Sequence, residues 1–304
     1  MSAPTLSASL RAEFGDALQE NATLAPYTSA RIGGPADLLI TAGSATELVR
    51  AITHLRGQGI DFLLLGGGSN VLVGDRGVRG VVLLNRAKAV RFEGGDRPTV
   101  WAESGATFSQ LAHRAAARGL GGLEWAATVP GTVGGAVYGN AGAFGGDVAH
   151  DLIHAEVWTE NGLETWPVEK FGYGYRTSLL KRGDARGIVI TAQFSLTNAV
   201  KEEVSATIEQ FSARRKATQP PGASMGSMFK NPAGDHAGRL IEAAGLKGAR
   251  IGNAEISPIH ANFFINHGQT CAADMRALIE LAQKTVHEKF GIELELEVEL
   301  IGEW

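Results

Sequence analysis

The 304-residue chain has very little cysteine and no long apolar run, and each shortage excludes a class of protein. Cys271 is the only cysteine, so no intrachain disulfide can form and a zinc site built from several thiolates is excluded. No apolar stretch approaches the roughly 20 residues that a membrane-spanning helix requires. We therefore expect a protein that has neither a disulfide framework nor a membrane partner.

Positive charge is not in excess either. The chain carries 28 Lys and Arg residues against 32 Asp and Glu residues, which gives a net charge of −4. A broad nucleic-acid surface requires clustered excess Lys and Arg, so we expect no nucleic-acid partner. Residues 1–6 lack the basic region and long apolar core of a signal peptide, and the expected location is the cytoplasm.

Glycine, in contrast, is abundant, with 40 residues. The glycines form separate clusters at 66–68, 119–122, 131–135 and 139–146, between periodic segments. This spacing is typical of turns that meet a ligand rather than of low-complexity sequence. The chain length favours two or more domains with a substantial buried core.

The most informative glycine cluster follows the apolar run Phe62–Leu65. Gly66–Gly68 can approach a ligand closely and adopt positive φ angles. Ser69 and Asn70 then add short polar side chains, and successive N–H groups in such a turn can form a concavity that binds anions. A phosphate or pyrophosphate is the expected ligand, and a plain tight turn between two strands is the alternative.

Three familiar ligand motifs do not fit the chain. Val71 stands where the Rossmann fingerprint requires its third glycine, and no Walker A motif occurs. His150 and His154 have the spacing of a helical zinc site, but the segment from His154 onward is predicted to be an extended strand. An extended segment does not form the required helical face, so we expect no metal there.

Periodicity predicts a mixed α+β fold. Residues 1–25 are expected to be a helical or irregular lead-in, and residues 121–146 show almost no helical periodicity. Ser44–Glu47 is a capping box that opens a helix, and Ile292–Leu300 alternates apolar and acidic residues, which predicts a strand with one acidic face. The other predicted helices lie at 107–118, 204–218, 237–244 and 272–290, and the other predicted strands at 37–40, 61–65, 78–84, 89–92, 99–103, 154–159, 164–167 and 187–196.

Two further segments are candidate sites. Arg176 lies in an aromatic, glycine-punctuated turn, and its guanidinium suits a carboxylate or phosphate. The alternative is a surface arginine packed on tyrosine. Ser227 is followed closely by Lys230 and Asn231, but no Gly-x-Ser-x-Gly elbow surrounds it, so a turn or helix cap is the alternative.

The last predicted strand places four glutamates on one face. A solvated face is the ordinary interpretation of such a pattern. A carboxylate enclosed in a pocket would instead have its pKa raised by desolvation and by like-charged neighbours, which would make it a proton donor. The four residues are Glu293, Glu295, Glu297 and Glu299.

Taken together, these segments resemble the UDP-N-acetylenolpyruvoylglucosamine reductases, flavoenzymes of bacterial peptidoglycan precursor synthesis. The resemblance covers nearly the whole chain, from about Thr28 to Gly302, and its specificity comes from eight motifs in order. These motifs are Arg31–Ala36, Leu65–Leu72, Gly119–Trp125, Val129–Ala136, Gly139–Gly145, Tyr175–Arg176, Gly226–Pro232 and Glu297–Val298.

The resemblance implies an FAD-binding fold of the vanillyl-alcohol-oxidase (PCMH) type with a C-terminal α+β substrate-binding domain. The implied organisation is a lead-in over residues 1–30, the FAD-binding domain over 31–198 and the substrate-binding domain over 199–304, with a polar boundary segment at 198–203. FAD would be bound non-covalently and NADPH would donate the hydride. The implied reaction reduces UDP-N-acetylglucosamine enolpyruvate to UDP-N-acetylmuramate, and the expected form is a cytoplasmic monomer.

The resemblance also assigns roles to individual residues of this chain. The family's catalytic arginine maps onto Arg176, its serine proton donor onto Ser227 and its glutamate onto Glu297. The expected FAD-binding residues are Arg31, Gly66, Gly67, Gly68, Ser69, Asn70, Pro130, Gly131, Thr132, Gly134 and Gly135. The expected substrate-binding residues are Tyr175, Lys230, Asn231, His260 and Asn262, and Asn231 is the better supported of the pair Lys230 and Asn231.

One departure from the family pattern concerns the nucleotide. Some members carry an inserted loop whose tyrosine closes over it, but here no tyrosine occurs between Tyr175 and Ser227. The chain therefore resembles the shorter subtype, and the candidates for covering the uridine are His260, Asn262 and the 214–216 basic cluster. The alternatives in function are an FAD-linked alcohol or lactone oxidase of the same fold and a non-catalytic nucleotide-sugar sensor, which would lack the yellow colour of flavin.

Overall fold

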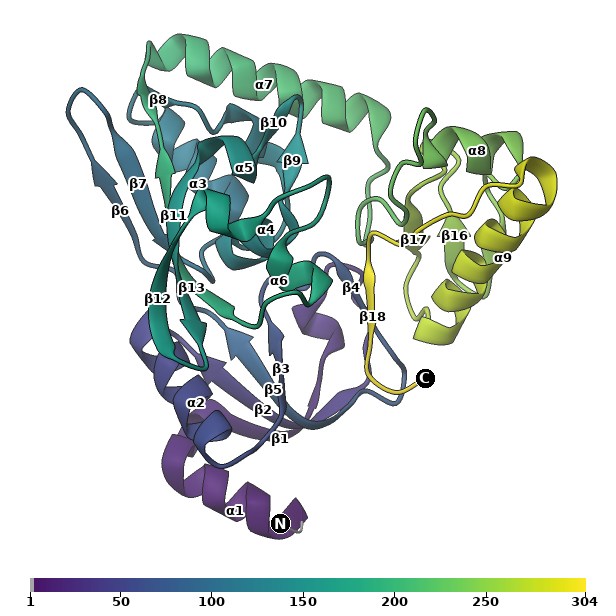
Figure 1. Ribbon diagram of the computed structural model, residues 1–304. Helices are drawn as coiled ribbons and strands as arrows, with labels where there is room; N and C mark the ends of the chain where they lie inside the picture. The colour runs from purple at the N-terminus through teal and green to yellow at the C-terminus, as the bar shows by residue number, and fades with distance from the viewer. Residues whose placement is uncertain (1–2) are drawn as a thin grey trace. The chain divides into compact units, whose positions relative to one another are not determined.

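The computed structural model describes residues 3–304, which form mixed helices and strands (Figure 1). The chain divides into two compact units, and each is assembled from separate stretches of sequence. Unit 1 consists of the described residues up to Ile40 together with Gly68–Val82 and Lys216–Trp304, and unit 2 consists of Thr41–Gly67 and Leu83–Arg215. The α+β character predicted from the sequence is confirmed.

The centre of unit 2 is a five-stranded antiparallel sheet of order β12-β11-β13-β7-β6. Its middle strand, β13 (Ile188–Ser195), is mostly buried along its length because helices contact it as well as strands. The strands beside it are β11 (Leu152–Thr159) and β7 (Thr99–Glu103), and the edges are β12 (Gly162–Pro167) and β6 (Val90–Glu93). The sequence predicts a short strand at each of these five positions, and all five are confirmed.

Helices α2 (Ala45–Gly57) and α4 (Val133–Gly139) both contact β13 (Figure 1). The predicted capping box opens α2: the Ser44 side chain accepts the Glu47 N–H at 3.2 Å, and the Glu47 carboxylate accepts the Gly43 N–H at 2.7 Å. The other long helices of this unit are α3 (Phe108–Ala116) and most of α7 (Lys201–Thr218), and α2 leads into β3 (Phe62–Leu65).

Helix α4 is a finding that the sequence does not predict, because its glycines weaken helix formation. Two backbone bonds fix its first turn: the Val133 N–H donates to the Ala106 carbonyl at 2.9 Å, and the Gly134 N–H donates to the Ser104 carbonyl at 2.8 Å. These tertiary hydrogen bonds thus stabilise a helix that its own glycine-rich sequence would not favour. The remaining short elements of unit 2 are β8 (Leu120–Gly121), η3 (Glu124–Thr128), β9 (Gly142–Ala143), β10 (Gly146–Asp147), α5 (Val148–Asp151), η4 (Val168–Phe171), α6 (Leu179–Arg182) and β14 (Thr197–Asn198).

The N-terminal part of unit 1 contains α1 (Ala3–Phe14), η1 (Gly15–Ala17), β1 (Leu18–Thr23), η2 (Ala25–Tyr27) and β2 (Pro35–Ala42). Strand β1 pairs antiparallel with β2, with Leu18 opposite Ile40, and β5 (Val78–Asn85) is the next strand of the sheet. The sequence predicts no strand at β1, because the segment is largely polar and exposed. Backbone pairing with β2, rather than an apolar pattern, makes it a strand.

The C-terminal part of unit 1 is a small antiparallel sheet covered by two helices (Figure 1). Helix α9 (Ala272–Phe290) contacts β15 (Arg250–Ile251) and β16 (Ala254–Ile256), and its predicted apolar face is confirmed as buried. Its first two N–H groups, at Ala272 and Ala273, donate to the Asp75 carboxylate at 2.6 and 2.9 Å. The remaining elements are α8 (Ala237–Ala243) and β17 (Phe264–Asn266).

The final strand is shorter than the alternating pattern predicts. Regular pairing is confined to β18 (Glu299–Ile301), which lies parallel to β4 (Val71–Val73). The alternation of burial holds in part: Leu294 and Val298 are buried and Glu293 and Glu295 are exposed, whereas Glu297 and Glu299 are half-buried. The strand is interrupted because residues 295–297 bond to a different neighbour, the segment Met228–Lys230.

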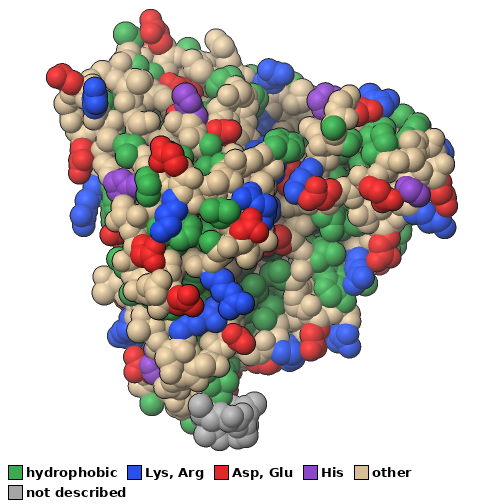
Figure 2. All heavy atoms as spheres, viewed as in Figure 1, with side chains coloured by type: hydrophobic (Ala, Val, Ile, Leu, Met, Phe, Trp, Pro, Cys, Tyr) green, Lys and Arg blue, Asp and Glu red, His purple; other side chains and the backbone are tan. Residues whose placement is uncertain are grey.

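Acidic and basic side chains are intermixed on the face of the molecule drawn in Figure 2. This mixture follows from the nearly balanced numbers of acidic and basic residues. Within residues 3–304, no helix combines the length and the apolar character needed to cross a bilayer.

Candidate functional site

Two glycine segments that are distant in the sequence pack closely together in unit 2, at Gly66 against the Thr132 side chain and at Gly67 against the Gly131 backbone. A Cβ added to Gly66 would lie 2.7 Å from Thr132 Oγ1, and one added to Gly67 would lie 2.9 Å from the Cα of Gly131. Contacts this short leave no room for a side chain at Gly66 or Gly67. The sequence-predicted anion loop and the Val129–Ala136 motif therefore form one surface.

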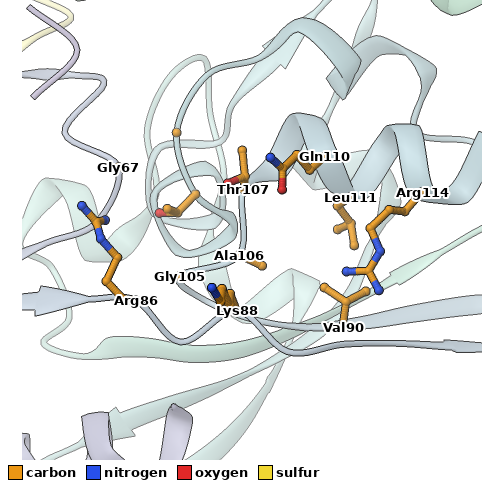
Figure 3. A pocket seen from close by; sticks show the side chains of 12 residues that line it. Gly67, Arg86, Lys88, Val90, Gly105, Ala106, Thr107, Gln110, Leu111 and Arg114 are labelled. Atoms are coloured by element: carbon orange, nitrogen blue, oxygen red, sulfur yellow. The ribbon is translucent and has the colours of Figure 1, made fainter. Parts of the chain in front are cut away.

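A cavity of about 550 Å³ opens beside this surface, lined in part by Gly67 and Gly131 (Figure 3). Three cations line it, and its twelve lining residues include no carboxylate. Arg86 lies on the side of Gly67, where it donates to the Gly66 carbonyl at 2.9 Å, while Arg114 lies at the opposite end and Lys88 between them. Accessible backbone together with positive charge suits a phosphate-bearing ligand.

The rest of the anion loop belongs to unit 1. Gly68 has φ +59°, and a Cβ there would lie 2.1 Å from the Tyr27 carbonyl oxygen, so only glycine fits. The Ser29 N–H donates to the Gly68 carbonyl at 2.9 Å, which joins the loop to the segment before Arg31. Arg31 is exposed and also has a positive φ, of +55°.

The remaining predicted FAD-loop residues are placed as follows. Gly134 packs against Ser104, where a Cβ would lie 2.8 Å from the Ser104 Cβ. Pro130 and Gly135 are exposed, and Ser69 is half-buried. Within the basic 214–216 cluster, Arg215 donates to the Thr128 carbonyl at 2.5 Å and so ties α7 to the start of the Val129–Ala136 motif.

Ser227 and Glu297 lie on neighbouring segments of unit 1. The Glu297 N–H donates to the Met228 carbonyl at 2.9 Å, and Phe229 forms an isolated bridge with Leu296. Both Ser227 and Glu297 are half-buried. The structure therefore brings together two of the three predicted catalytic residues; the third, Arg176, belongs to unit 2.

Asn262 holds the segment that carries Ser227 from its other side. Its buried side-chain amide accepts the Phe229 N–H at 2.9 Å and donates to the Phe229 carbonyl at 2.8 Å. Its backbone carbonyl accepts the Met228 N–H at 2.8 Å, and Phe263 forms a bridge with Ser227. Both polar groups of the Asn262 side chain are thus used within the chain.

We expect Asn262→Leu to lower the free energy of unfolding by about 2–4 kcal/mol. The substitution removes two buried hydrogen bonds and leaves the N–H and carbonyl of Phe229 without these partners, at about 1–3 kcal/mol for each buried group. Urea unfolding of the purified variant measures the change. Asn253→Leu is the matched control, because the exposed Asn253 amide makes one bond to the Gly268 carbonyl, at 2.9 Å. Equal losses for the two variants would contradict this account.

The other predicted substrate-binding residues of unit 1 also have partners within the chain. The Lys230 ammonium pairs with the Glu295 carboxylate, and the Asn231 side-chain oxygen accepts the N–H of Ala237, the first residue of α8. His260 Nδ1 accepts the Asn262 N–H at 3.2 Å, and burial lowers the pKa of His260 below its ordinary value. His260 is therefore neutral near pH 7 with its proton on Nε2.

Arg176 is held in a defined position in unit 2. Its backbone is left-handed, with φ +55°, and its guanidinium donates to the Gly142 carbonyl at 2.6 Å. The ring of Tyr175, which is 57% exposed, lies 5.6 Å from the guanidinium carbon. Because the Gly142 carbonyl is neutral, this hydrogen bond fixes the orientation of the guanidinium without pairing it with a negative charge.

Three further bonds fix the turn around Arg176. The Tyr173 hydroxyl donates to the Val137 carbonyl at 2.9 Å, the Ser178 hydroxyl donates to the Tyr138 carbonyl at 2.6 Å, and the Asn140 amide donates to the Gly174 carbonyl at 3.0 Å. Burial raises the pKa of Tyr173, so its hydroxyl stays a donor. Asn140 was not singled out from the sequence, although the glycines beside it in the motif were a signal.

The two-histidine pattern does not form one helical face. His150 lies in the short helix α5 and His154 in strand β11, as its extended pattern predicted. Over the part of the chain that the structure describes, no three His, Cys, Asp or Glu side chains lie together as metal ligands would.

Comparison with known proteins gives a consistent set of matches. Residues 217–301 match the family described as UDP-N-acetylenolpyruvoylglucosamine reductase, C-terminal domain, and residues 36–166 match an FAD binding domain. The chain is 46% identical over 290 residues to the UDP-N-acetylenolpyruvoylglucosamine reductase of Chloroflexus aggregans, which covers 93% of this chain and 97% of that protein. It is 41% identical over 298 residues to the enzyme of the same name from Halalkalibacterium halodurans, which covers 97% of this chain and 98% of that protein.

A solved structure agrees with these sequence matches. The crystal structure of UDP-N-acetylenolpyruvylglucosamine reductase from Thermus caldophilus superposes with a TM-score of 0.79 at 38% identity, covering 91% of this chain and 97% of that one. The predicted FAD-binding domain, followed by a C-terminal domain of the reductase family, is thereby confirmed.

Proposed function

The chain belongs to the UDP-N-acetylenolpyruvoylglucosamine reductase family, and from this membership we propose which of its residues carry out the reaction. It is an FAD-dependent oxidoreductase that uses NADPH to reduce the enolpyruvyl ether of UDP-N-acetylglucosamine enolpyruvate to UDP-N-acetylmuramate, a step of peptidoglycan precursor synthesis. The named relatives favour this reductase over the alcohol or lactone oxidase alternative and over a non-catalytic sensor.

The glycine surface fits the diphosphate of FAD. Gly66–Gly67 packs closely against Gly131–Thr132, and the cavity beside them carries Arg86 and Lys88. These features supply N–H donors and positive charge without a covalent link. When bound, FAD supplies the hydride chemistry of the reaction. Arg31, Gly68, Ser69, Asn70, Pro130, Gly134 and Gly135 complete the proposed set.

The observation that carries the catalytic proposal is the pairing of the Ser227 and Glu297 segments through the Met228 carbonyl at 2.9 Å. We assign Ser227 as the donor of the proton that completes the lactyl ether, and Glu297, on the neighbouring segment, as a protonated carboxyl that helps Arg176 to stabilise the developing negative charge. A serine hydroxyl is a poor acid in water, so its position and neighbours must favour the transfer. We assign to Arg176, which is anchored on the Gly142 carbonyl, the stabilisation of the negative charge that spreads into the substrate carboxylate.

The UDP part of the substrate is assigned to Tyr175, Lys230, Asn231 and His260. Asn262, whose side chain bonds to the Phe229 backbone, is assigned to the same subsite as the residue that holds the segment of Lys230. Lys230 pairs with Glu295, so a diphosphate would compete with that carboxylate for the ammonium. His260 is neutral and carries its proton on Nε2, which makes it a hydrogen-bond donor rather than a cation in this assignment.

The decisive test of the function is NADPH oxidation with and without UDP-N-acetylglucosamine enolpyruvate. We expect a yellow protein whose steady NADPH consumption depends on this substrate, with little oxygen uptake. Substrate-independent consumption accompanied by oxygen uptake would favour the oxidase alternative. A colourless protein that FAD cannot reconstitute would exclude both.

Gly68→Ala is expected to yield protein that retains less than about a tenth of the wild-type flavin. The added Cβ would lie 2.1 Å from the Tyr27 carbonyl oxygen, so the loop must move away from its binding geometry. Flavin absorbance per protein and an FAD fluorescence titration measure the loss. Gly80→Ala is the matched control, since Gly80 has φ +87° but no atom within 4 Å of its added Cβ. Equal flavin loss in both would implicate backbone strain instead.

We also propose that the enzyme acts in the cytoplasm as a monomer. Its single cysteine, Cys271, is compatible with a reducing compartment. Sedimentation velocity of the flavin-loaded protein tests the oligomeric state, and a dimer at micromolar concentration would refute the monomer.

A further inference from the structure

Asn70 joins the glycine loop to the segment that carries Glu297. Its side-chain amide donates to the Glu297 carbonyl at 2.9 Å, and its own backbone carbonyl accepts the Glu299 N–H at 3.0 Å. The two bonds lie on either side of Val298 along the final segment. Asn70 directly precedes β4, and Glu297 lies two residues before β18.

The side-chain bond acts where regular pairing has ended. Strands β4 and β18 pair only from Val71 and Glu299 onward, so their ladder does not reach Glu297. The Glu297 backbone is instead held on one side by the Met228 carbonyl, which accepts its N–H, and on the other by the Asn70 amide. The Asn70 amide thus holds the Glu297 backbone in place, as a backbone hydrogen bond between the two strands holds Glu299.

We propose that Asn70 is a positioning residue for Glu297, whose carboxyl it places relative to Ser227 through the Glu297 carbonyl. The proposal rests on the catalytic role proposed for Glu297. Asn70 is the last residue of the loop Gly66–Asn70, which is assigned to the FAD diphosphate. The position of the Glu297 carboxyl therefore depends on the conformation of that loop. Gly68, where a Cβ would meet the Tyr27 carbonyl oxygen, fixes that loop two residues earlier.

The two half-reactions of the flavin-loaded enzyme test this role. In Asn70→Ala at saturating FAD, we expect reoxidation by UDP-N-acetylglucosamine enolpyruvate to slow about tenfold more than flavin reduction by NADPH. Tenfold corresponds to about 1.4 kcal/mol, the size of one hydrogen bond. Asn70→Asp keeps the side-chain size but lacks the donor, and it should show the same asymmetry if the alanine variant folds poorly. Equal slowing of both half-reactions would mean that Asn70 serves only the loop or the fold.

A double-mutant cycle identifies the residue through which Asn70 acts. In a Glu297→Gln background, Asn70→Ala should slow reoxidation by less than about threefold, because the group that it positions is already changed. A full tenfold effect in that background would overturn the proposal. FAD affinity, measured by fluorescence titration, gives a readout that is independent of turnover.

Controls separate this inference from the function on which it rests. Asn253→Ala removes a hydrogen bond from the side-chain amide to the Gly268 carbonyl, which is also 2.9 Å long. Both half-reactions of this variant should stay within about twofold of wild type. If Glu297→Gln reoxidises normally, the role of Glu297 fails and this proposal fails with it. If Glu297→Gln is slow while Asn70→Ala reoxidises at the wild-type rate, only the Asn70 proposal fails.

Discussion

Ser227→Ala is expected to slow reoxidation of the reduced enzyme by UDP-N-acetylglucosamine enolpyruvate about 10²–10⁴-fold, the usual contribution of a positioned proton donor. Flavin reduction by NADPH should stay near the wild-type rate, since no proton is delivered to the enolpyruvyl carbon in that half-reaction. Stopped-flow absorbance of the flavin measures each half-reaction separately. The backbone bridge between Ser227 and Phe263 does not involve the hydroxyl, so alanine retains it.

Ser224→Ala is the control for this result. Ser224 is half-buried in the same segment but has no role in the proposed proton transfer, and its substitution should leave both half-reactions unchanged. Should Ser227→Ala impair both half-reactions equally, Ser227 would be a structural residue. The function would then need another proton donor, and Glu297→Gln would be the next variant to measure.

Arg176→Met is expected to lower kcat for the complete reaction about 10²–10³-fold, which is typical for loss of one group that stabilises developing negative charge. The side chain is anchored on the Gly142 carbonyl at 2.6 Å, so its charge is already oriented before substrate arrives. Methionine has a comparable length but supplies neither the charge nor the donors. Steady-state kinetics with saturating NADPH measure the loss.

Two variants qualify the arginine result. Arg176→Lys keeps the charge without the planar fork, and it should recover only part of the activity. Arg276→Met removes an exposed guanidinium that pairs with Glu280 on α9, and its activity should match wild type. An Arg176→Met enzyme with unchanged kcat would remove this residue from the catalytic set.

Elements with strong local patterns were predicted well from the sequence. Helix α9 has apolar residues at helical spacing, and that stripe is the face it buries. Ser44 and Glu47 mark the start of α2 because their side chains satisfy N–H groups within a few residues. In both cases the determining interactions are local or follow directly from periodicity.

Elements that depend on distant partners were missed. Strand β1 has no apolar alternation and owes its conformation to pairing with β2. Helix α4 is glycine-rich and begins on the carbonyls of Ser104 and Ala106. The segment 295–297 leaves the regular strand because Met228–Lys230 competes for its backbone groups. No local pattern encodes these choices.

The candidate site shows the same division. Ordered motifs located Ser227 and Glu297, and the structure makes them neighbours. The hydrogen bond between Asn70 and Glu297 joins residues 227 positions apart, and neither motif predicts it. Asn262 was selected as a substrate contact, yet its side chain is used on the backbone of Phe229, because a buried amide satisfies its own hydrogen bonds first.

The composite make-up of unit 1 constrains how such proteins can be recombined. Its C-terminal stretch depends on earlier parts of the chain: Asp75 accepts the first N–H groups of α9, β4 pairs with β18, and the Asn266 amide donates to the Ala30 carbonyl at 2.8 Å. A chimaera made by one crossover near residue 216 would take these partners from two different parents. A successful exchange of this unit between relatives would have to transfer all three stretches together.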